Sequence, residues 1–286
     1  METVNIPKVS ILIPCFNHEK YLLECLNSLL LAYSGELEII ICDDGSKDNS
    51  IKIINNFITH NKLKGISFTF LKHTENKGVS ATLNECLNYT SSEYIYIIAS
   101  DDYLVPGGLT TAIDVMKSND VDAVISDCNV VDDKGSMVSD SAFFKYRSSS
   151  PKRIIKNLPE ELVFNWVVPG PSLLLKRSVY DKIGYYDEDL MAEDRDFYLR
   201  LTSKVKVFFN SKIIANYRVH NSNFSKSNIY LDKRNHEFAI VNYRASGLYT
   251  GLAAWYLSSY KMDILGLHKL PRALRKILRV AYILTH

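Results

Sequence analysis

The chain has 286 residues and lacks several features by which large protein classes are recognised. Its five cysteines are odd in number and scattered, and none forms a Cys-x-x-Cys pair: Cys15, Cys25, Cys42, Cys86 and Cys128. A disulfide framework and a cysteine-based zinc site are therefore not expected. Most of these residues lie in apolar stretches, which predicts buried, reduced thiols in a cytosolic protein.

Long apolar runs are missing as well. No run reaches the roughly 18 apolar residues that spanning a bilayer requires, and the N-terminal stretch METVNIPK has no apolar signal core. The net charge of +2 gives no sign of a nucleic-acid partner. The charge is unevenly distributed along the chain. Residues 261–286 hold six basic side chains and one acidic side chain, which leaves −3 for the first 260 residues.

Common nucleotide-binding motifs are also absent. A Rossmann dehydrogenase needs GxGxxG after its first strand, where this chain has PCFNHE (14–19), and a P-loop motif, GxxxxGK[ST], does not occur. A sugar-1-phosphate nucleotidyltransferase would carry a glycine-rich loop with Arg and Lys at the same place. That loop is missing too, although such an enzyme shares the sheet architecture predicted below and stays an alternative.

The first half of the chain has a regular pattern of strands and helices. Stretches with helical apolar spacing separate five short apolar runs, at 9–16, 37–42, 66–72, 94–100 and 122–127. Such runs are typical of a parallel sheet covered on both faces, so we predict an α/β fold. The second half is interrupted by prolines at positions 151, 159, 169 and 171, and the chain from about residue 230 is predicted to be mostly helical.

Acidic pairs follow two of the predicted strands. Asp43 and Asp44 follow the second strand, and Asp101 and Asp102 follow the fourth. Each pair alone is equally well explained as turn and helix-capping residues. Ligands of open parallel sheets bind at the carboxyl ends of the strands, where both pairs are expected to lie. Together they favour a site for sugar hydroxyls or for Mg²⁺ or Mn²⁺, which bind carboxylate oxygens and bridge to phosphates.

The order of the motifs resembles family 2 glycosyltransferases, which have the GT-A fold. The stretches that carry the resemblance are VSILIPCFNHEKYLLECLNSLL (9–30), EIIICDDGSKDNS (38–50), ENKGVSATLNECL (75–87), YIYIIASDDYLVPGGL (94–109), GPSLLLKRSVYDKIGYYDEDLMAEDRDFYLRL (170–201) and YRVHNSNFS (217–225). Each motif is weak alone, but their common order over roughly residues 8–225 is specific.

The resemblance implies a fold and an activity. The fold is a GT-A domain over residues 1–225, with a mostly parallel, Rossmann-like sheet flanked by helices. Its nucleotide-sugar half would be 1–128 and its acceptor half 129–225, followed by a helical extension at 226–286. The implied enzyme is an inverting, metal-dependent, hexosyltransferase-like glycosyltransferase. It would move a sugar from a UDP-linked donor to a glycan or lipid-linked acceptor, in bacterial surface polysaccharides such as O-antigen or capsule. A non-catalytic protein that binds nucleotide sugars is the alternative.

The resemblance also assigns roles to single residues. The expected nucleotide-binding residues are Pro14, Phe16, Asn17, Glu19, Asp44, Lys77, Gly78 and Asp101. Asp102 would ligate the metal directly, and His220 would help to hold the metal or the pyrophosphate, unless it is an ordinary packed histidine. Ala99 stands where the family's acidic motif has its first aspartate, which leaves the division of roles between Asp101 and Asp102 open.

The stretch AEDRDFYLRL (192–201) carries the expected catalytic base, Asp194, with Glu193 as the residue that orients the acceptor. Helical spacing turns the apolar residues of this stretch toward the core and lets Arg200 pair with Asp196. Glu193 and Asp194 are left at the helix start, where the macrodipole favours an ionised carboxylate. Ordinary helix capping is the alternative interpretation.

The C-terminal stretch is predicted to be a basic amphipathic helix. Its apolar stripe consists of Leu270, Leu274, Ile277, Leu278, Ala281 and Leu284, and its basic residues are Arg272, Arg275, Lys276 and Arg279. Such a helix suits an anionic membrane surface. It equally suits packing on the domain or in a homodimer. The expected location is the cytoplasm, with peripheral attachment at the inner face of the cell membrane.

Overall fold

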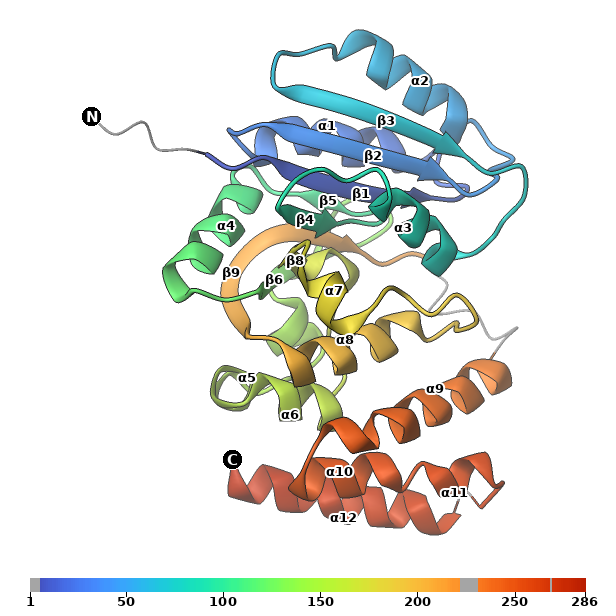
Figure 1. The fold of residues 1–286 in the computed structure, drawn as a ribbon, viewed down its shortest axis with the longest axis vertical. Coiled ribbons are helices and arrows are strands. Elements are labelled where there is room, and N and C mark those ends of the chain that lie inside the picture. The colour runs from blue at the N-terminus through green and yellow to red at the C-terminus, as the bar shows by residue number, and fades with distance from the viewer. Residues whose placement is uncertain (1–5, 222–230, 268) are drawn as a thin grey trace.

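The computed structural model describes residues 6–221, 231–267 and 269–286 (Figure 1). Its described part contains one sheet of nine strands, in the order β3-β2-β1-β4-β8-β6-β9-β5, with β7 paired to β6. The strands are β1 (Val9–Cys15), β2 (Leu37–Asp43), β3 (Ile66–Lys72), β4 (Tyr94–Ile97), β5 (Tyr103–Leu104), β6 (Ala123–Val131), β7 (Met137–Ser139), β8 (Leu173–Lys176) and β9 (Val207–Arg218).

The predicted strands of the first half form the parallel part of the sheet. β3, β2, β1 and β4 are neighbours, and each pair among them is parallel. Their register pairs Cys15 with Asp43 and Asp43 with Lys72, so these three strands end at the same edge. The loops that follow them, including the one with Asp44, therefore start side by side, as parallel pairing requires.

The second half completes the sheet in a less regular way. β8 inserts between β4 and β6 and is antiparallel to both. The stretches KVKVFF (204–209) and KIIANYRVH (212–220) are each typical of a strand, but the structure has one curved strand there, β9 (Figure 1). Its pairing with β6 shifts register near Asp127, and bulges of this kind bend a strand without ending it.

Helices cover both faces of the sheet, as the buried strands require. The main helices before the extension are α1 (Leu22–Ala32), α2 (Ser50–His60), α3 (Val79–Leu87), α4 (Gly108–Asn119), α5 (Pro151–Lys156), α6 (Leu158–Phe164), α7 (Val179–Ile183) and α8 (Glu193–Lys204). One apolar cluster joins α1, α2 and α4 to one face, and a second joins α3, α6, α7 and α8 to the other. All five cysteines are free and buried, in line with their apolar surroundings in the sequence.

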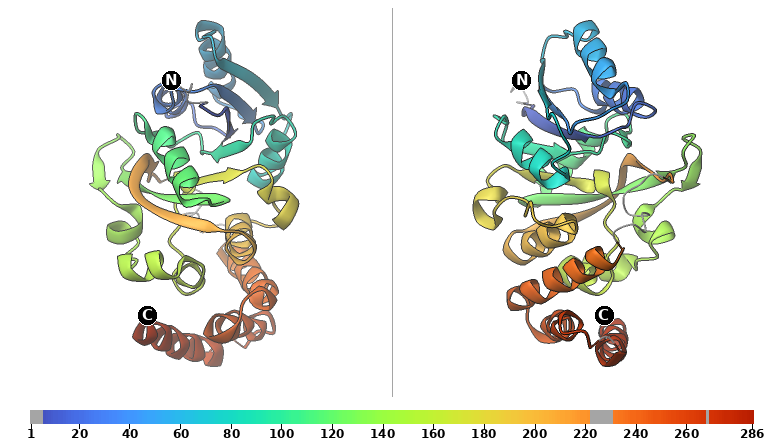
Figure 2. Two further views of the ribbon diagram at one scale, coloured as in Figure 1. Left: turned by 60° about the vertical axis from the view of Figure 1, so that its left-hand side comes forward. Right: turned by 90° about the vertical axis from the view of Figure 1, so that its right-hand side faces the viewer.

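The last helices form a layer at the end of the molecule opposite α2 (Figure 2). They are α9 (Leu231–Ala245), α10 (Gly251–Ser258), α11 (Lys261–Ile264) and α12 (Lys269–Thr285). A third apolar cluster joins α9, α10 and α12 to α6 and α8. The expected domain boundary at 225/226 falls outside the described residues. Within the described ranges, no helix is long and apolar enough to cross a membrane.

Candidate active site

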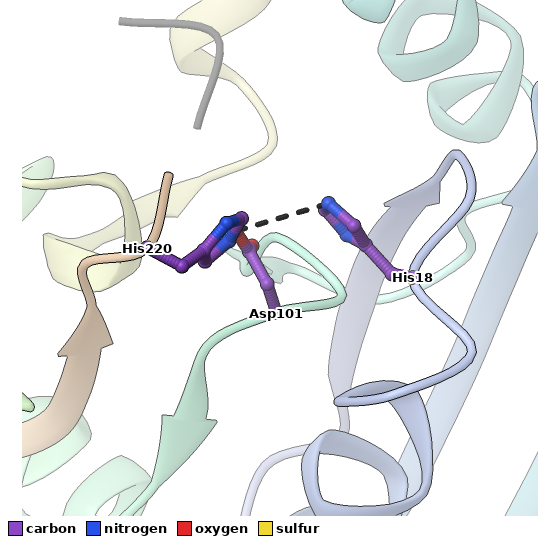
Figure 3. Close-up of side chains that lie close together, drawn as sticks. All are labelled: His18, Asp101 and His220. Carbon is purple, nitrogen blue, oxygen red and sulfur yellow. Dashed lines mark hydrogen bonds and ion pairs between the residues drawn. The ribbon is translucent and has the colours of Figure 1, made fainter. Parts of the chain in front are cut away.

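Two histidines and an aspartate meet at the carboxyl end of the parallel strands (Figure 3). His18 follows β1, Asp101 follows β4, and His220 follows β9. His220 Nε2 lies 2.8 Å from Asp101 Oδ2, and His18 Nε2 lies 3.9 Å from the same oxygen. One ligand atom from each residue lies within 4.8 Å of the others, a spacing that lets all three bind one metal ion. Among the described residues this is the one such group.

The surroundings of the cluster fix its charges. Burial opposes the ionisation of Asp101, but the hydrogen bond from His220 and the nearby His18 hold the pKa of Asp101 below its ordinary value. Burial lowers the pKa of His18, which Asp101 partly offsets. The Nδ1 atom of His18 lies 2.8 Å from Ser100 Oγ, which leaves Nε2 directed at the cluster. A carboxylate beside neutral imidazole is the charge state that a divalent metal needs.

Asp102 has a different environment from its neighbour. It is buried, and its Oδ1 accepts a hydrogen bond from the backbone N–H of Arg218 at 2.8 Å. Burial and then the charge of Asp101 raise the pKa of Asp102 well above the ordinary value. A Cβ atom on Gly170 would lie 3.3 Å from Asp102 Oδ2, so the neighbouring chain packs closely against this carboxyl group. The cluster contains Asp101 and His220 but not Asp102, and this geometry favours Asp101 as the metal ligand.

Arg218 holds this acidic segment in place. It is buried, and its guanidinium donates to the carbonyl oxygens of Asp101 and Asp132 and pairs with Glu24. The ring of Tyr21 lies beneath the guanidinium at 5.0 Å and also stacks on His220. The position of the cluster therefore depends on a residue whose side chain is not itself a metal ligand.

Three of the expected nucleotide-binding residues, Asp44, Lys77 and Gly78, lie in two adjoining loops, which follow β2 and β3. Both oxygens of Asp44 accept backbone hydrogen bonds, from Lys77 at 2.8 Å and from Gly78 at 2.9 Å. Gly78 has φ 91°, and no heavy atom lies within 4 Å of a Cβ placed there, so the chain leaves open space at this point. The Asp44 carboxylate is thus fixed by the loop that the sequence places beside it.

The segment after β1 lies against the loop after β2. Asn17, at φ 54°, accepts a hydrogen bond from the Lys47 N–H, and Glu19 accepts one from the Asn49 N–H. Phe16 leaves 41% of its surface exposed, and Pro14 is half-buried at the end of β1. These residues border the edge that carries Asp44, but the contacts of Asn17 and Glu19 are with the protein itself.

The expected catalytic residues lie at the first two positions of α8. The helix begins at Glu193, its apolar residues Phe197, Tyr198 and Leu201 are buried, and Arg200 pairs with Asp196 at 2.6 Å, which confirms the predicted helix and its pattern. The side chain of Asp194 is exposed, whereas Glu193 is half-buried.

The two carboxyl groups have unequal proton affinities. Burial raises the pKa of Glu193 to about 8, and the charge of Asp194 adds to this effect. Desolvation by the surrounding protein also raises the pKa of Asp194, but Arg195 and Arg147 oppose the rise. At neutral pH Glu193 is therefore largely protonated, whereas Arg195 and Arg147 favour the ionised form of Asp194. One group can accept a proton while the other donates a hydrogen bond.

The extension supports the start of α8. The buried guanidinium of Arg195 donates to Asn242 of α9 at 2.7 Å and to the backbone carbonyls of Leu162 and Val163. The backbone N–H of Met191, just before the helix, donates to Glu237 of α9 at 2.6 Å. The position of Asp194 therefore depends on helices that come after the sheet in the chain.

Several residues of the site were not assigned from the sequence. His18 stands inside a quoted motif, but no spacing rule links it to residues about 80 and 200 positions away. Arg218 sits in the YRVH stretch, and its burial is not readable from a charged residue type. Within the described part of the chain, Arg147 has a buried Nε atom without a hydrogen-bond partner, and it lies close enough to Asp194 to influence the pKa of that residue.

The sheet and its helices have the arrangement of the GT-A glycosyltransferases. The structure is similar to that of S. aureus TarS 1–349 in complex with UDP-GlcNAc, with a TM-score of 0.66 and 21% identity over 91% of this chain and 72% of that one. It is also similar to the mannosyltransferase PcManGT from Pyrobaculum calidifontis in complex with GDP-Man and Mn²⁺. There the TM-score is 0.60 and the identity 14%, over 97% of this chain and 86% of that one. The predicted α/β fold of GT-A type is confirmed.

Comparison of the amino-acid sequence with known families identifies the family. The model of Glycosyl transferase family 2 matches residues 10–184. Chondroitin synthase of Escherichia coli is 27% identical over 245 residues, which are 85% of this chain and 33% of that synthase. The chain thus spans a third of the length of this relative. The chain belongs to glycosyltransferase family 2, as the order of its motifs suggested.

Proposed function

We propose that this chain is an inverting, metal-dependent glycosyltransferase that uses a nucleotide sugar, preferably UDP-linked. The observation that carries the proposal is the cluster of His18, Asp101 and His220 at the carboxyl ends of the strands of a family 2 domain. TarS is described with UDP-GlcNAc and PcManGT with GDP-Man and Mn²⁺, which supports a nucleotide-sugar donor here.

The cluster fits a divalent metal by its donor set. It offers one carboxylate oxygen and two imidazole nitrogens, which suits Mn²⁺ better than Mg²⁺, because Mg²⁺ prefers oxygen ligands alone. When bound, the ion would neutralise charge that develops on the diphosphate leaving group. We assign the ligand role to His18, Asp101 and His220. Asp102 would support them through its hydrogen bond with the Arg218 backbone.

Asp194 is the proposed catalytic base. Its exposed carboxylate would accept the proton of an acceptor hydroxyl as that oxygen attacks the anomeric carbon from the face opposite the nucleotide. One displacement inverts the configuration and needs no covalent intermediate. Glu193, protonated at neutral pH, would donate a hydrogen bond that orients the acceptor.

For the acceptor we propose a chemical class, and for the location a cellular setting. The E. coli relative is a chondroitin synthase, which supports a saccharide acceptor in surface polysaccharide synthesis, either a glycan or a lipid-linked saccharide. O-antigen or capsule assembly in the cytoplasm is the proposed setting. A non-catalytic nucleotide-sugar-binding protein is the alternative, and the exposed Asp194 favours the enzyme.

We also propose a peripheral membrane surface on α12. The expected apolar stripe divides in two: Leu278 packs inward, together with Tyr282 from outside the stripe. Ile277 and Leu284 of the stripe are 66% and 80% exposed. The α12 outer face, defined as Leu274, Ile277, Val280, Ile283 and Leu284, is flanked by Arg272, Lys276 and Arg279. The helix has no acidic residue. An anionic lipid surface satisfies both the apolar and the basic side chains, whereas a second copy would bring like charges together.

Ligand-induced thermal stabilisation tests the central proposal. We expect UDP or UDP-sugars, each with Mn²⁺, to raise the melting temperature of the full chain, with GDP as the comparison nucleotide. A metal-dependent rise is expected because the metal links the protein to the diphosphate. Stabilisation by neither nucleotide, with or without Mn²⁺, would contradict the proposal.

A further inference from the structure

His73 is a buried histidine held between two carboxylates. It follows β3 directly, and only 2% of its side chain is exposed. Its Nδ1 atom lies 2.6 Å from Asp44 Oδ1, and its Nε2 atom lies 2.7 Å from Glu85 Oε2 on α3. A carboxylate only accepts hydrogen bonds, and a neutral imidazole carries a single N–H. Two such short contacts therefore require both nitrogens to be protonated, which makes the ring an imidazolium.

The other charged and titratable groups around the ring act in both directions. Cys42 Sγ of β2 lies 3.6 Å from Nε2, and the pKa of Cys42 is itself lowered, mainly by a hydrogen bond from Cys86 of α3. Lys77 Nζ lies 3.9 Å from Glu85 Oε2 and opposes the positive charge on the ring. Burial lowers the pKa of His73, but the bonds to Asp44 and Glu85 outweigh burial, and the pKa is raised overall.

The imidazolium completes the set of donors on Asp44. The carboxylate accepts from the backbone of Lys77, from the backbone of Gly78 and from His73, all within or beside one loop. A carboxylate has about four lone-pair sites, so one remains for a ligand N–H. These three donors set the direction in which that last site points.

We propose that His73 is a positioning residue which, as an imidazolium, fixes Asp44 for the nucleotide base, so that binding of the base weakens when the ring loses its proton. The inference rests on the proposed function, because it takes Asp44 as the acceptor for a base N–H.

Deprotonation would turn one short contact into a repulsive one. A neutral ring keeps one N–H and presents a lone pair to the other carboxylate. Glu85 is 36% exposed at its side chain and can turn toward solvent and Lys77, so the link to α3 breaks first. The ring is then held on one side only, and Asp44 loses part of its fixed orientation.

Uridine is the sharpest probe, because it has the base but no phosphate and therefore needs no metal. We expect its dissociation constant, followed by NMR titration of the full chain, to rise roughly 5-fold between about pH 6 and about pH 8.5. That range stays below the ionisation of the uracil imide. His73→Gln, which cannot become cationic, should bind uridine as weakly at low pH as the wild type does at high pH, and its affinity should not change with pH.

Glu85→Gln is the matched variant. It keeps a hydrogen-bond acceptor at Nε2 but removes the charge that stabilises the imidazolium, so the loss of uridine binding should begin at lower pH. The NMR shifts of the His73 ring nitrogens give a measurement independent of ligand. Both should be protonated at about pH 7, and a single neutral tautomer there would overturn the inference.

Two failures can be told apart. A flat uridine affinity in the wild type, or a His73→Gln variant with wild-type affinity at every pH, overturns the role of His73 and leaves the proposed function standing. Absence of both uridine and UDP binding at every pH overturns the proposed function. The NMR shifts of the His73 ring nitrogens then still show whether the ring is an imidazolium between Asp44 and Glu85.

Discussion

Asp101 and Asp102 are neighbours in sequence, yet the structure gives them opposite electrostatic environments. The pKa of Asp101 is held low by His220 and His18, while burial raises that of Asp102. The neighbouring groups thus favour the ionised form of Asp101 and burial the neutral form of Asp102, which supports the proposal that Asp101 is the metal ligand. A sequence motif shows that two acids are adjacent but not which one meets the histidines.

Matched substitutions separate these roles. Asp101→Asn should weaken Mn²⁺ binding, measured by calorimetry in the presence of UDP, by roughly 10²-fold, because one of three protein ligands loses its charge. Asp102→Asn should change Mn²⁺ affinity only about 2-fold, since the amide reproduces a neutral carboxyl group. The reverse ranking would return the ligand role to Asp102.

The pH dependence of turnover reports on Asp194. A protonated carboxyl group cannot accept a proton, so kcat/KM should rise with pH through the pKa of Asp194, which lies above its ordinary value. Arg147 lowers that pKa, and Arg147→Met should therefore move the rising limb to higher pH. A rate profile over about pH 5 to 9 checks this. A rising limb that moves to lower pH, or does not move, would show that Arg147 does not lower the pKa of Asp194.

At the scale of elements, α3 links the two halves of the site. Glu85 contacts His73 beside the nucleotide residues, and the adjacent Asn84 accepts from the N–H of Tyr186 and donates to its carbonyl oxygen at 3.0 and 2.9 Å. Asn84 also donates to Glu188 at 2.8 Å. The segment 184–192 leads directly into α8, so one helix contacts both the expected nucleotide loop and the segment that precedes the proposed catalytic base.

Asn84→Ala tests this link. Loss of these hydrogen bonds, each worth about 1 kcal/mol, should loosen the start of α8. We expect kcat to fall about 10-fold while the Kd for UDP changes less than about 2-fold. Asn88→Ala, at the exposed C-terminal end of the same helix, is the control and should leave both values unchanged. An equal loss of UDP affinity in Asn84→Ala would contradict this, because it would show that Asn84 supports the nucleotide loop as much as the start of α8.

The first four strands and their helices could be predicted from the sequence because short apolar runs and turn residues are local signals. The antiparallel insertion of β8 could not, since LLLK (173–176) reads as a strand in either direction and its neighbours come from long-range pairing. The same distinction between local and long-range signals applies to the residues of the site. Acids at strand ends were found from their position, whereas the approach of His18 and the contacts of His73 depend on packing between distant segments.

At the scale of the whole molecule, the extension is packed into the fold and is not a separate appendage. Tyr282 of α12 stacks on Phe164 with ring centres 4.3 Å apart and donates a hydrogen bond to the buried Glu161 at 3.0 Å. One side of α12 thus closes the core beneath α6 and α8, and the other side is the α12 outer face. The membrane proposed for that face would lie at the end of the molecule opposite α2 (Figure 1).

Vesicle binding tests the membrane proposal. The wild type should co-sediment with vesicles of anionic phospholipid at low salt but not with phosphatidylcholine vesicles, and the pair Ile277→Glu and Leu284→Glu should abolish binding. Asn55→Glu with Asn56→Glu on α2 adds the same charge at the opposite end and is the control. If the wild type instead forms a dimer that the α12 pair disrupts, the face is a self-association surface and the membrane proposal is wrong.

The central claim is that the chain transfers sugar from a nucleotide sugar with Asp194 as the base. The most direct measurement is the release of UDP from a panel of UDP-sugars with Mn²⁺ and a saccharide acceptor, comparing the wild type with Asp194→Asn. The account predicts turnover in the wild type and a loss of roughly 10²-fold or more in the variant, with UDP and Mn²⁺ affinities unchanged, because only the proton acceptor is removed. A variant that keeps substantial turnover, or one that loses UDP binding as well, would contradict it.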